Sequence, residues 1–565
     1  MKILLSKRAI TRVQGIVILV LIVAVGLGAY YFALQPAGPS ATATTSLKEV
    51  TVATKDTLIM GTTDAVWTTI DPSDAYDAFA WLLINNLGSP LIDIAPGSAA
   101  GPNDLVPALA ESWSMSSDGL TWTFNLKKGV MFSDGVEFTA DDVKYSFDRG
   151  MTIANPEGAV VGIGYSDIID SVAVVSKYQV KFNLKLPAAF FGQLMAAVPS
   201  YIVNPRFAPM KYFRINYTEG DARASSPLDL GPYTLTHWKR AGAKDQEMRL
   251  DANPYYWNAA AGYPKTKHMI LKFYSDATAL ALAIQSGDVD LAYKELTPTD
   301  IQSLQKNPQV KVWQGPSQFI QYMVFQEHIK PFDDPEVRRA IAAAVDRKAI
   351  CDTVFLGQAI PLYSMVANGM AYHVDSFKKL GDMNYEYTKT TLAKHGYSET
   401  KKLSFDLWYE SSGHYQSSSD IALVVRNSLE KSGVIQVNLK SAAWATFRST
   451  IKAESIAVWI IGWYPDYVDP DNYVFPLLNS KVSGWNHHNY KNPQFDQLSD
   501  QQRVEVDPAK RAQLLASLQD LIAEDVPVVP LFQRSNWAVS KPNVDGVVLD
   551  ISMIFRFGGI VVKEQ

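Results

Sequence analysis

Residues 105–149 read LVPALAESWSMSSDGLTWTFNLKKGVMFSDGVEFTADDVKYSFDR, and this stretch carries the clearest indication of fold in the chain. Within it, residues 121–126 and 136–140 alternate apolar and polar side chains on either side of a Ser-Asp-Gly turn, which predicts two strands. Thr139 and Asp142 then have the spacing of a capping box, so a helix is expected to begin there. The stretch therefore predicts a small β-rich unit.

The sequence outside this unit alternates short β-like runs with amphipathic helices, a pattern typical of α/β lobes. Residues 270–273 predict a strand, and Asp276 can cap the helix that follows it. Gly287 is expected to end that helix, and residues 289–292 predict the next strand. The β-rich unit is therefore expected to be an insertion in an α/β lobe.

Length and composition limit the kind of protein. The chain has 565 residues, 47% of them hydrophobic and 19% charged, so two or three folded lobes are expected. A net charge of −5 without a basic run gives no indication of a nucleic-acid surface. The single cysteine, Cys351, excludes an intrachain disulfide and a paired-cysteine metal site, and a buried filling role is expected for it.

The N-terminal segment predicts a membrane anchor. Residues 15–34 read GIVILVLIVAVGLGAYYFAL, which is uncharged and long enough to span a bilayer, after a basic cytoplasmic segment at 1–14. Residues 35–50 are rich in small polar side chains and predict a flexible linker. A cleaved secretory signal is the alternative. The RAIT motif at 8–11 resembles the cleavage motif of archaeal pilin-like signal peptides, and cutting there would leave the anchor on the protein.

A short acidic stretch allows several interpretations. Residues 460–473 read IIGWYPDYVDPDNY and hold Asp466, Asp469 and Asp471. An EF-hand loop starting at Asp466 would need glycine and glutamate where Asp471 and Leu477 stand, so that interpretation fails. A carboxylate pair of a hydrolase stays open, although the GxSxG, HExxH and P-loop motifs are absent from the sequence. A turn built by proline and aspartate also accounts for the pattern.

The stretch at 105–149 closely resembles the hallmark block of family 5 extracellular solute-binding proteins, the peptide, nickel and oligosaccharide receptors of ABC importers. The resemblance covers residues 55–550, and together with the N-terminus it identifies the chain as an archaeal-type, membrane-anchored member. Further matches follow in the family's order: GPYTLTHWK (231–239), NPYYWN (253–258), SGDVDLAY (286–293), FDDPEVRRAIAAAVDRKAI (332–350), YKNPQFDQLSDQQR (490–503) and the stretch 526–546.

The resemblance implies a fold as well as a function. It implies an α/β, two-lobed, periplasmic-binding-protein-like fold (class II, cluster C) with an extra β-rich subdomain in lobe I, and here an N-terminal transmembrane helix. Ligand is held between the lobes, and contacts that exist only in the closed form favour closure. The implied segments are 51–92, 228–310 and 531–562 for lobe I, 93–227 for its β-rich subdomain, and 311–530 for lobe II.

The resemblance also implies ligand-binding residues. Peptide-binding members carry a tryptophan and, three residues on, an aspartate that pairs with the α-ammonium of the ligand, and these match Trp463 and Asp466. Tyr464 is expected beside them. Trp444 matches another cleft tryptophan, with a core position as the alternative. Arg534 lies where the family places a ligand-contacting side chain and could hold a carboxylate, or else form a surface ion pair.

Two further candidates are Ser89 and Trp67. Ser89 stands where the family commonly has glutamate, a departure that weakens the analogy with the peptide receptors, and Trp67 is either a cleft wall or a core residue. Asp469 and Asp471 are expected to cap the helix after Pro470. The adjacent histidines at 487–488 have no partner at metal-ligand spacing, so structural roles are expected for them.

The function that follows is an extracellular receptor, not an enzyme, that captures peptides and delivers them to ABC permease subunits. An oligosaccharide receptor of the same family is the alternative, since aromatic clefts also suit sugar rings. A hydrolase that uses the 466–471 loop and a cell-surface interaction protein are alternatives of other classes. We expect no cofactor and no nucleic-acid partner. A monomer held at the cell membrane by a single-pass anchor is expected, with its binding domain outside.

Overall fold

The computed structural model describes residues 56–563 except 68, 154–157, 209–216, 219, 223–224, 243, 295, 413 and 483–484. The predicted cytoplasmic segment, transmembrane anchor and linker at 1–14, 15–34 and 35–50 lie outside the described residues, as do residues 51–55 of predicted lobe I. Within the described part of the chain, no helix is both long enough and apolar enough to cross a membrane.

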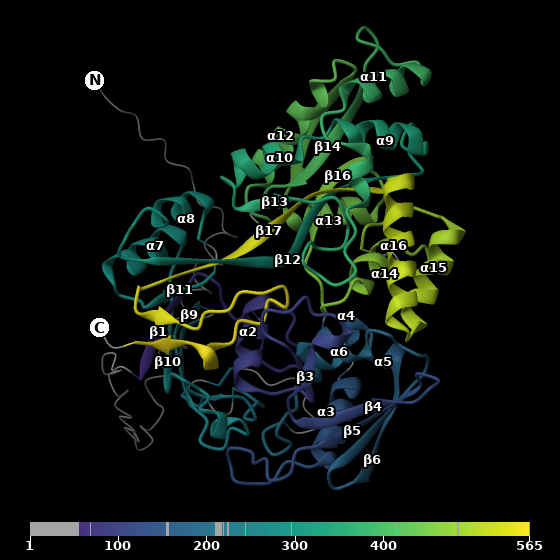
Figure 1. Ribbon diagram of the computed structural model, residues 1–565. Helices are drawn as coiled ribbons and strands as arrows, with labels where there is room; N and C mark the ends of the chain where they lie inside the picture. Colours follow the sequence, from purple (N-terminus) through teal and green to yellow (C-terminus); the bar gives the residue numbers. More distant parts are fainter. Residues whose placement is uncertain are drawn as a thin grey trace, which may run out of the picture. The chain divides into compact units, whose positions relative to one another are not determined.

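An eleven-stranded mixed sheet is the main element of the structure, in the order β15-β14-β16-β12-β17-β11-β1-β10-β9-β8, with β13 paired to β17 (Figure 1). Its strands are β1 (Thr57–Thr62), β8 (Tyr233–Ala241), β9 (Lys244–Ala252), β10 (His268–Phe273), β11 (Leu291–Ala292), β12 (Lys311–Phe325), β13 (Ala359–Pro361), β14 (Leu403–Glu410), β15 (Ile435–Ala442), β16 (Val458–Trp463) and β17 (Val528–Ser540).

Lobe I is the part of the molecule that contains β1, β8, β9, β10 and β11, and lobe II is the part that contains β14, β15 and β16. The long strands β12 and β17 lie side by side and belong to both lobes (Figure 1). β12 pairs along its length with β17, and its second half also pairs with β16. The β12–β17 register shifts between Pro316 and Ile320, midway between the lobes. The predicted boundary at 530/531 falls inside β17.

Local sequence accounts for the helices of lobe I. Asp276 accepts a hydrogen bond from the Ala279 amide at 2.9 Å and caps α7, and Gly287 ends that helix with a φ of 84°, as the sequence predicts. The helices of lobe I are α2 (Ala78–Leu87), α7 (Ala277–Ser286) and α8 (Pro298–Leu304). Buried side chains of α2 pack with those of β1, such as Leu58 and Met60.

The β-rich subdomain contains a four-stranded antiparallel sheet in the order β4-β5-β7-β6. The capping box of Thr139 and Asp142 opens α3 as predicted. The strand predicted at 136–140 is wrong, because the chain makes only one bridge there, between Met131 and Glu137, before Thr139 begins the helix cap. The elements are β4 (Ala110–Met115), β5 (Thr121–Leu126), β6 (Ile169–Ser176), β7 (Gln179–Leu184), α3 (Ala140–Thr152), α4 (Ala159–Ile163), α5 (Tyr165–Ile168) and α6 (Phe191–Ala196).

Lobe II has its own core around the centre of the sheet. Residues 320–325 of β12 are all buried, as expected for a central strand covered on both faces. Its helices are α9 (Pro335–Ala344), α10 (Arg347–Ala349), α11 (Tyr385–Lys394), α12 (Ser418–Glu430), α13 (Trp444–Lys452), α14 (Asp471–Leu478), α15 (Pro493–Val504) and α16 (Pro508–Asp525). Cys351 is buried in this core, in the position expected for filling.

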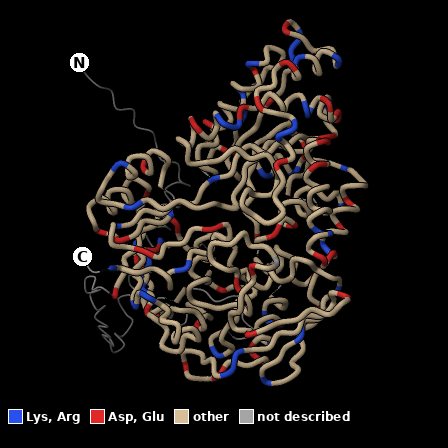
Figure 2. Tube along the Cα trace, in the orientation of Figure 1, with Lys and Arg blue, Asp and Glu red and all other residues tan. Residues whose placement is uncertain are grey.

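Short elements complete the described chain. Two small antiparallel pairs join β2 to β3 and β18 to β19. Their bounds and those of the helical turns are β2 (Ile92–Ile94), β3 (Leu105–Pro107), β18 (Val544–Asp545), β19 (Val561–Val562), η1 (Pro102–Asp104), η2 (Val198–Ser200), η3 (Ala259–Ala261), η4 (Ile350–Val354), η5 (Ser376–Leu380) and η6 (Phe557–Gly559). Acidic and basic residues are interspersed along the whole trace (Figure 2).

Candidate ligand-binding site

A cavity of about 590 Å³ lies where the two lobes meet the paired strands β12 and β17. Lobe I contributes the residues around the start of α2 and those that follow β11. Lobe II contributes residues 462–464 and 466, at and beyond the end of β16. The middle of β12 supplies Ser317 and Phe319, and β17 supplies residues 534–537. The cavity is therefore walled by both lobes and by the strands that join them.

Aromatic side chains make up much of the cavity wall. Its tryptophans are Trp67, Trp81, Trp463, Trp485 and Trp537. Trp67 is 76% exposed, so this predicted residue lies at the rim of the cavity and not in a core. Flat aromatic faces of this kind can stack on rings or on apolar side chains of a ligand while their polar edges stay available.

Asp466 brings a carboxylate into the cavity wall. It is half-buried and accepts a hydrogen bond from the Tyr76 hydroxyl of lobe I at 2.5 Å. Burial raises the pKa of Asp466 to about 6, although hydrogen bonds with Tyr76 and Asn472 act in the opposite direction. Burial and the neighbouring carboxylate raise the pKa of Tyr76 far above its usual value, so its hydroxyl stays a donor.

Asn472 at the start of α14 fixes the orientation of two predicted ligand residues. Its side-chain oxygen accepts from the Asp466 amide at 2.9 Å and from the Trp463 indole nitrogen at 3.1 Å. Trp463, Tyr464 and Asp466, three of the predicted ligand residues, all line the cavity. Trp463 and Asp466, which are three residues apart in the sequence, therefore donate hydrogen bonds to the same side-chain oxygen of Asn472.

A second acid and a lysine lie on the lobe I side of the cavity. Asp77 accepts from the Ala80 amide at 2.7 Å as the cap of α2, and burial raises its pKa to about 6. Lys294, which lowers the pKa of Asp77, donates to Asp64 at 3.1 Å. This side of the cavity therefore holds both signs of charge.

Arg534 brings a guanidinium into the cavity from β17. It donates to the Gln416 side-chain oxygen at 2.9 Å, and its charged group lies 5.8 Å from the centre of the Phe319 ring. Asn536, two residues further along the same strand, also lines the cavity and donates to the Tyr293 hydroxyl at 3.3 Å. These contacts of Arg534 are with an amide and an aromatic ring, and they do not form the surface ion pair that was the alternative.

The other two acids of the loop do not line the cavity. Asp469 is 1% exposed and binds Arg511 with both oxygens, at 2.8 and 2.6 Å, while also accepting from the Asp471 amide at 2.8 Å. Asp471 is fully buried and accepts from the Tyr467 hydroxyl at 2.7 Å. These carboxylates hold the loop against α15 and α16, and only Asp469 also takes part in the predicted local cap.

Trp444, a predicted ligand residue with a core position as the alternative, does not line the cavity. It lies behind the cavity wall, where it stacks on His414 with ring centres 3.7 Å apart and contacts Tyr415 and Trp485. These three neighbours line the cavity, whereas Trp444 does not. Its position at the first residue of α13 places the ring in a second layer that supports them.

Ser89 is a second predicted residue that the structure places away from the cavity. It is 4% exposed, its hydroxyl accepts from the Trp257 indole nitrogen at 3.2 Å, and it does not line the cavity. Ser89 lies just past the end of α2, where its carbonyl also accepts from the Ile202 amide. It therefore joins α2 to the β-rich subdomain and has no contact with the ligand space.

Several cavity residues were not predicted from the sequence. They include Tyr76, Lys294, His414, Trp485 and Trp537. Each comes from a different segment, and none belongs to a motif with regular spacing. One general feature could have indicated them, namely the large number of tryptophans and tyrosines in the chain.

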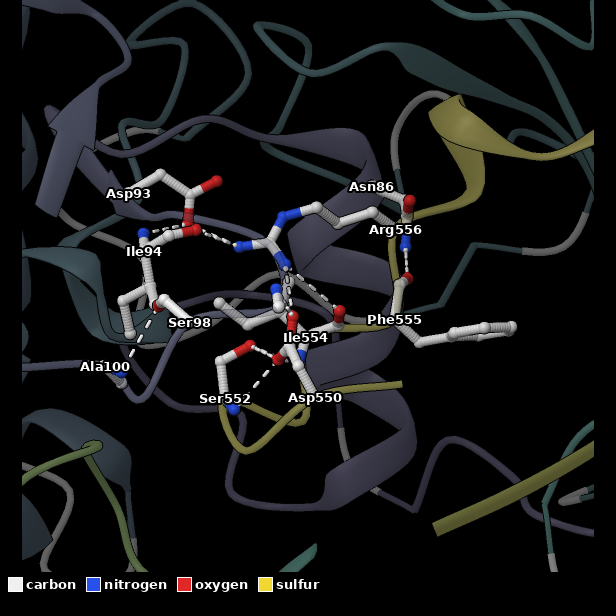
Figure 3. Close-up of polar contacts among 11 residues, drawn as sticks. Asn86, Asp93, Ile94, Ser98, Ala100, Asp550, Ser552, Ile554, Phe555 and Arg556 are labelled. Carbon is white, nitrogen blue, oxygen red and sulfur yellow. Dashed lines mark hydrogen bonds and ion pairs between the residues drawn. The ribbon is translucent and has the colours of Figure 1, made fainter. Parts of the chain in front are cut away.

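A polar cluster fixes the segment that returns to the cavity near the C-terminus. Arg556 donates to Asp93 at 3.0 Å and to the Ile94 carbonyl at 2.7 Å, and Figure 3 shows its guanidinium pointing toward both. Asp550 lies 3.8 Å from the same guanidinium. The cluster holds residues 550–556 in place, and Met553 of this segment lines the cavity.

The adjacent histidines, His487 and His488, lie away from the cavity and are at least partly buried. His488 is fully buried, and burial lowers its pKa to about 3. His487 is half-buried and takes a φ of 51°. Among the described residues, no three His, Cys, Asp or Glu side chains are grouped as metal ligands would be.

Two α/β lobes that share a pair of long strands, with a cavity at the junction, define a two-lobed ligand-binding protein. The sequence profile of bacterial extracellular solute-binding proteins, family 5 (middle region) matches residues 104–485. The chain therefore belongs to family 5 of the extracellular solute-binding proteins.

Similar proteins span almost the whole described chain. Di/tripeptide-binding protein 2 of Pseudomonas aeruginosa is 29% identical over 83% of this chain and 87% of its own length. Heme-binding protein A of Haemophilus influenzae is 27% identical over 82% of this chain and 85% of its own. Among solved structures, HbpA2 from Haemophilus parasuis has a TM-score of 0.78 at 22% identity, covering 90% of this chain and all of that one (100%).

Proposed function

We propose that this protein is an extracellular receptor of an ABC importer that captures a peptide between its lobes and passes it, chemically unchanged, to the permease. The observation that carries the proposal is Asp466, a carboxylate in the wall of the inter-lobe cavity with Trp463 beside it. Of the two relatives described above, one is named for di- and tripeptides and the other for heme, so the ligand class rests on the chemistry of the site.

The ammonium group of a peptide is the natural partner for Asp466. A charge-assisted hydrogen bond is stronger where water is scarce, and the burial that raises the pKa of Asp466 also removes water from its carboxylate. An ammonium that enters the cavity supplies both the missing charge and the missing donors. A ligand without an amine leaves that charge poorly compensated, which makes the carboxylate a selective element.

Groups on the joining strands suit the remainder of a peptide. Arg534 can bind a carboxylate with two parallel hydrogen bonds, and Ser317 and Asn536 offer polar groups for the peptide backbone. Tryptophan faces accommodate side chains of many shapes. Because the ligand contacts both lobes, binding favours the closed arrangement over an open one.

The proposal includes a membrane location. The uncharged residues 15–34 follow a basic segment, which favours a single-pass anchor of the archaeal type with the lobes outside the cell. Residues 35–50 would act as a tether between anchor and receptor. Detection of residues 15–34 by mass spectrometry of the membrane-extracted protein tests this part, and a mature N-terminus beyond residue 34 contradicts it.

Calorimetry with a peptide library tests the proposed ligand class. We expect short peptides with a free N-terminus to bind, and the same peptides after N-acetylation to bind at least about tenfold more weakly, since the charged hydrogen bond is lost. Mass spectrometry of material that co-purifies in the cavity identifies the natural ligand. Equal affinity for free and acetylated peptides would contradict the role of Asp466.

An oligosaccharide is the second candidate ligand, favoured by the tryptophans of the cavity wall. Sugar rings stack on aromatic faces, and the polar groups of β17 can bind hydroxyls. In this case oligosaccharides bind in the calorimeter, peptides do not, and Asp466→Asn leaves the affinity nearly unchanged. The two candidates are therefore separated by one set of titrations.

A further inference from the structure

Met553 differs from the other residues of the cavity wall in its backbone conformation. Its φ of 59° lies in the left-handed region, which residues other than glycine, asparagine and aspartate rarely adopt. Such a conformation is costly and persists only where the surrounding structure holds it. Both chain neighbours, Ser552 and Ile554, are buried, whereas Met553 is half-buried and lines the cavity. The strained backbone therefore presents one side chain to the ligand space.

Polar contacts hold Met553 in this conformation. The Met553 amide donates to the Asp550 carbonyl at 3.1 Å. The Asp550 carboxylate accepts from both the Ser552 amide, at 2.9 Å, and the Ser552 hydroxyl (Figure 3). Asp550 also accepts from the Gly97 amide at 2.8 Å and lies 3.8 Å from the Arg556 guanidinium. The turn that contains Met553 is therefore anchored to other parts of lobe I.

The wall next to this turn is aromatic. Tyr293 lines the cavity and stacks on Phe555 of the same segment, with ring centres 4.1 Å apart. A thioether has no hydrogen to donate and is only a weak acceptor. A polar ligand side chain placed against Met553 would therefore lose water without gaining a strong partner, whereas an apolar side chain would gain from burial.

The methionine side chain suits a wall that meets ligands of different shapes. It is unbranched, rotates about three bonds and carries a polarizable sulfur, so it can adjust to linear, branched and aromatic groups. The backbone of Met553 is held in place while its side chain stays adaptable. A tryptophan in the same wall offers a larger but more rigid surface.

We propose that Met553 is a specificity-determining residue of the inter-lobe cavity, which selects peptides that carry an apolar side chain at one position and accepts several shapes there. This inference rests on the proposed peptide function. Leucine, methionine and phenylalanine are the preferred residues at that position, and serine and aspartate are disfavoured. The turn at 550–556 acts as the support that keeps the thioether in the wall.

Calorimetry with peptides varied at one position at a time tests the selectivity. At the position that contacts Met553, the wild-type protein should bind leucine and phenylalanine peptides about tenfold more tightly than serine peptides. Met553→Gly removes the thioether, and glycine adopts the positive φ without strain. In this variant the preference should fall to about threefold or less, because the apolar contact is lost.

Met383→Gly is the matched control. Met383 also has a positive φ, of 51°, and is 45% exposed, but it does not line the cavity. Each glycine variant removes a methionine side chain and relieves a left-handed backbone, so each should unfold in urea at a higher midpoint than the corresponding alanine variant. Only Met553→Gly should alter the preference among peptides.

The methyl resonance of Met553 tests the contact directly. In protein labelled at its methionine methyl groups, the signal that is missing from Met553→Gly belongs to Met553. It should shift when a phenylalanine peptide saturates the cavity, while the Met383 signal stays in place. An unchanged Met553 signal, or a preference that survives Met553→Gly, would overturn this inference and leave peptide binding intact. If no peptide binds, the proposed function and this inference fail together.

Discussion

The carboxylate of Asp466 is the most informative single group in the molecule. It belongs to lobe II, yet its side-chain partner, the Tyr76 hydroxyl, comes from lobe I. The neutral Tyr76 hydroxyl donates a hydrogen bond to this carboxylate but does not compensate its negative charge. Burial therefore keeps the pKa of Asp466 raised. Under the proposed function, this carboxylate would pair with the ammonium of the ligand.

Peptide affinity should depend on pH through Asp466. Below its pKa of about 6 the side chain binds a proton and loses the charge that attracts an ammonium, so affinity should rise with pH and level off above that value. One pH unit below the pKa, affinity should be about tenfold lower than the plateau. Asp466→Asn should remove the pH dependence and lower the plateau affinity about tenfold to a hundredfold, as measured by calorimetry.

N-acetylated peptides are the control for this prediction. They carry no ammonium, so their affinity for the wild-type protein should not rise with pH between 5 and 8, and their affinity for Asp466→Asn should be flat over this range (about three units around the pKa). A pH profile that is unchanged in Asp466→Asn would assign the titration to another group, such as Asp77, whose pKa is also raised to about 6.

The same shift predicts the pH dependence of stability without ligand. Because the folded state binds the Asp466 proton more tightly than the unfolded state, the free energy of unfolding should fall as pH rises from 3.8 to about 6. Asp466→Asn should show a smaller fall over this window in urea denaturation. Identical curves for the two proteins would show that the folded-state pKa of Asp466 is not raised.

Tyr76→Phe isolates the hydrogen bond between the lobes. The Tyr76 hydroxyl lowers the pKa of Asp466 relative to burial alone, so its removal should move the midpoint of the affinity–pH curve above 6. Tyr415→Phe is a suitable control, since its hydroxyl lies in the same wall but donates to the Gly462 carbonyl at 3.1 Å. An equal midpoint shift in both variants would rule out a specific role for Tyr76.

At the scale of elements, the three acids of the loop after β16 have two different positions. Asp466 faces the cavity, while Asp469 and Asp471 are buried against α15 and α16. The bidentate pair of Asp469 with Arg511 fixes the loop from behind. The position of Asp466 in the cavity wall therefore depends on an ion pair whose two residues do not line the cavity.

Asp469→Ala should destabilise lobe II strongly, because it leaves the Arg511 guanidinium buried without its carboxylate. Loss of one partner of a buried ion pair costs about 3–5 kcal/mol, and urea denaturation measures it. The double variant Asp469→Ala with Arg511→Met should recover part of the loss. A loss below about 1 kcal/mol in the single variant would show that the pair contributes little.

Local sequence rules predicted the elements that local forces determine. The cap of α7, its glycine terminus and the capping box of α3 appear in the structure as expected. The strand at 136–140 failed because a short-range alternation was interrupted by the helix cap that follows it.

Some predicted residues line the cavity, among them Trp67 and Arg534, which lie far apart in the sequence. Trp463, Tyr464 and Asp466 form one local motif and line the cavity together. Trp444 and Ser89, which were also predicted, do not line the cavity, because the difference between a wall and the layer behind it depends on tertiary packing. Tyr76 was missed for the same reason, since it reaches Asp466 across 390 residues of chain.

At the scale of the whole molecule, contacts beside the cavity hold the lobes and the subdomain together. Tyr467 of lobe II stacks on Phe190 of the β-rich subdomain with ring centres 5.2 Å apart, and the Arg503 guanidinium lies 5.0 Å from the same ring. The Ala189 amide also donates to the Arg503 carbonyl at 2.7 Å. The described arrangement is therefore one in which the lobes are in contact.

Gly315→Ala should disturb the site from a distance. A Cβ at this position in β12 would lie 2.1 Å from the Leu549 carbonyl oxygen, so the segment that carries Met553 must shift. We expect a several-fold loss of peptide affinity together with a loss of stability, because main-chain atoms have little room to yield. Gly559→Ala, where the nearest atom lies 3.7 Å away, should be tolerated, and equal effects of both variants would contradict this account.

The interruption in the β12–β17 ladder lies inside the cavity wall. Between Pro316 and Ile320 the strands lose their regular pairing, and this short stretch supplies Ser317 and Phe319 to the cavity. The irregular stretch of the β12–β17 pair therefore belongs to the cavity wall. Under the proposed function, a ligand bound there would restrict the relative movement of β12 and β17. The ligand-bound receptor would then have a more rigid junction between its lobes than the free receptor, and the importer could distinguish the two by this rigidity.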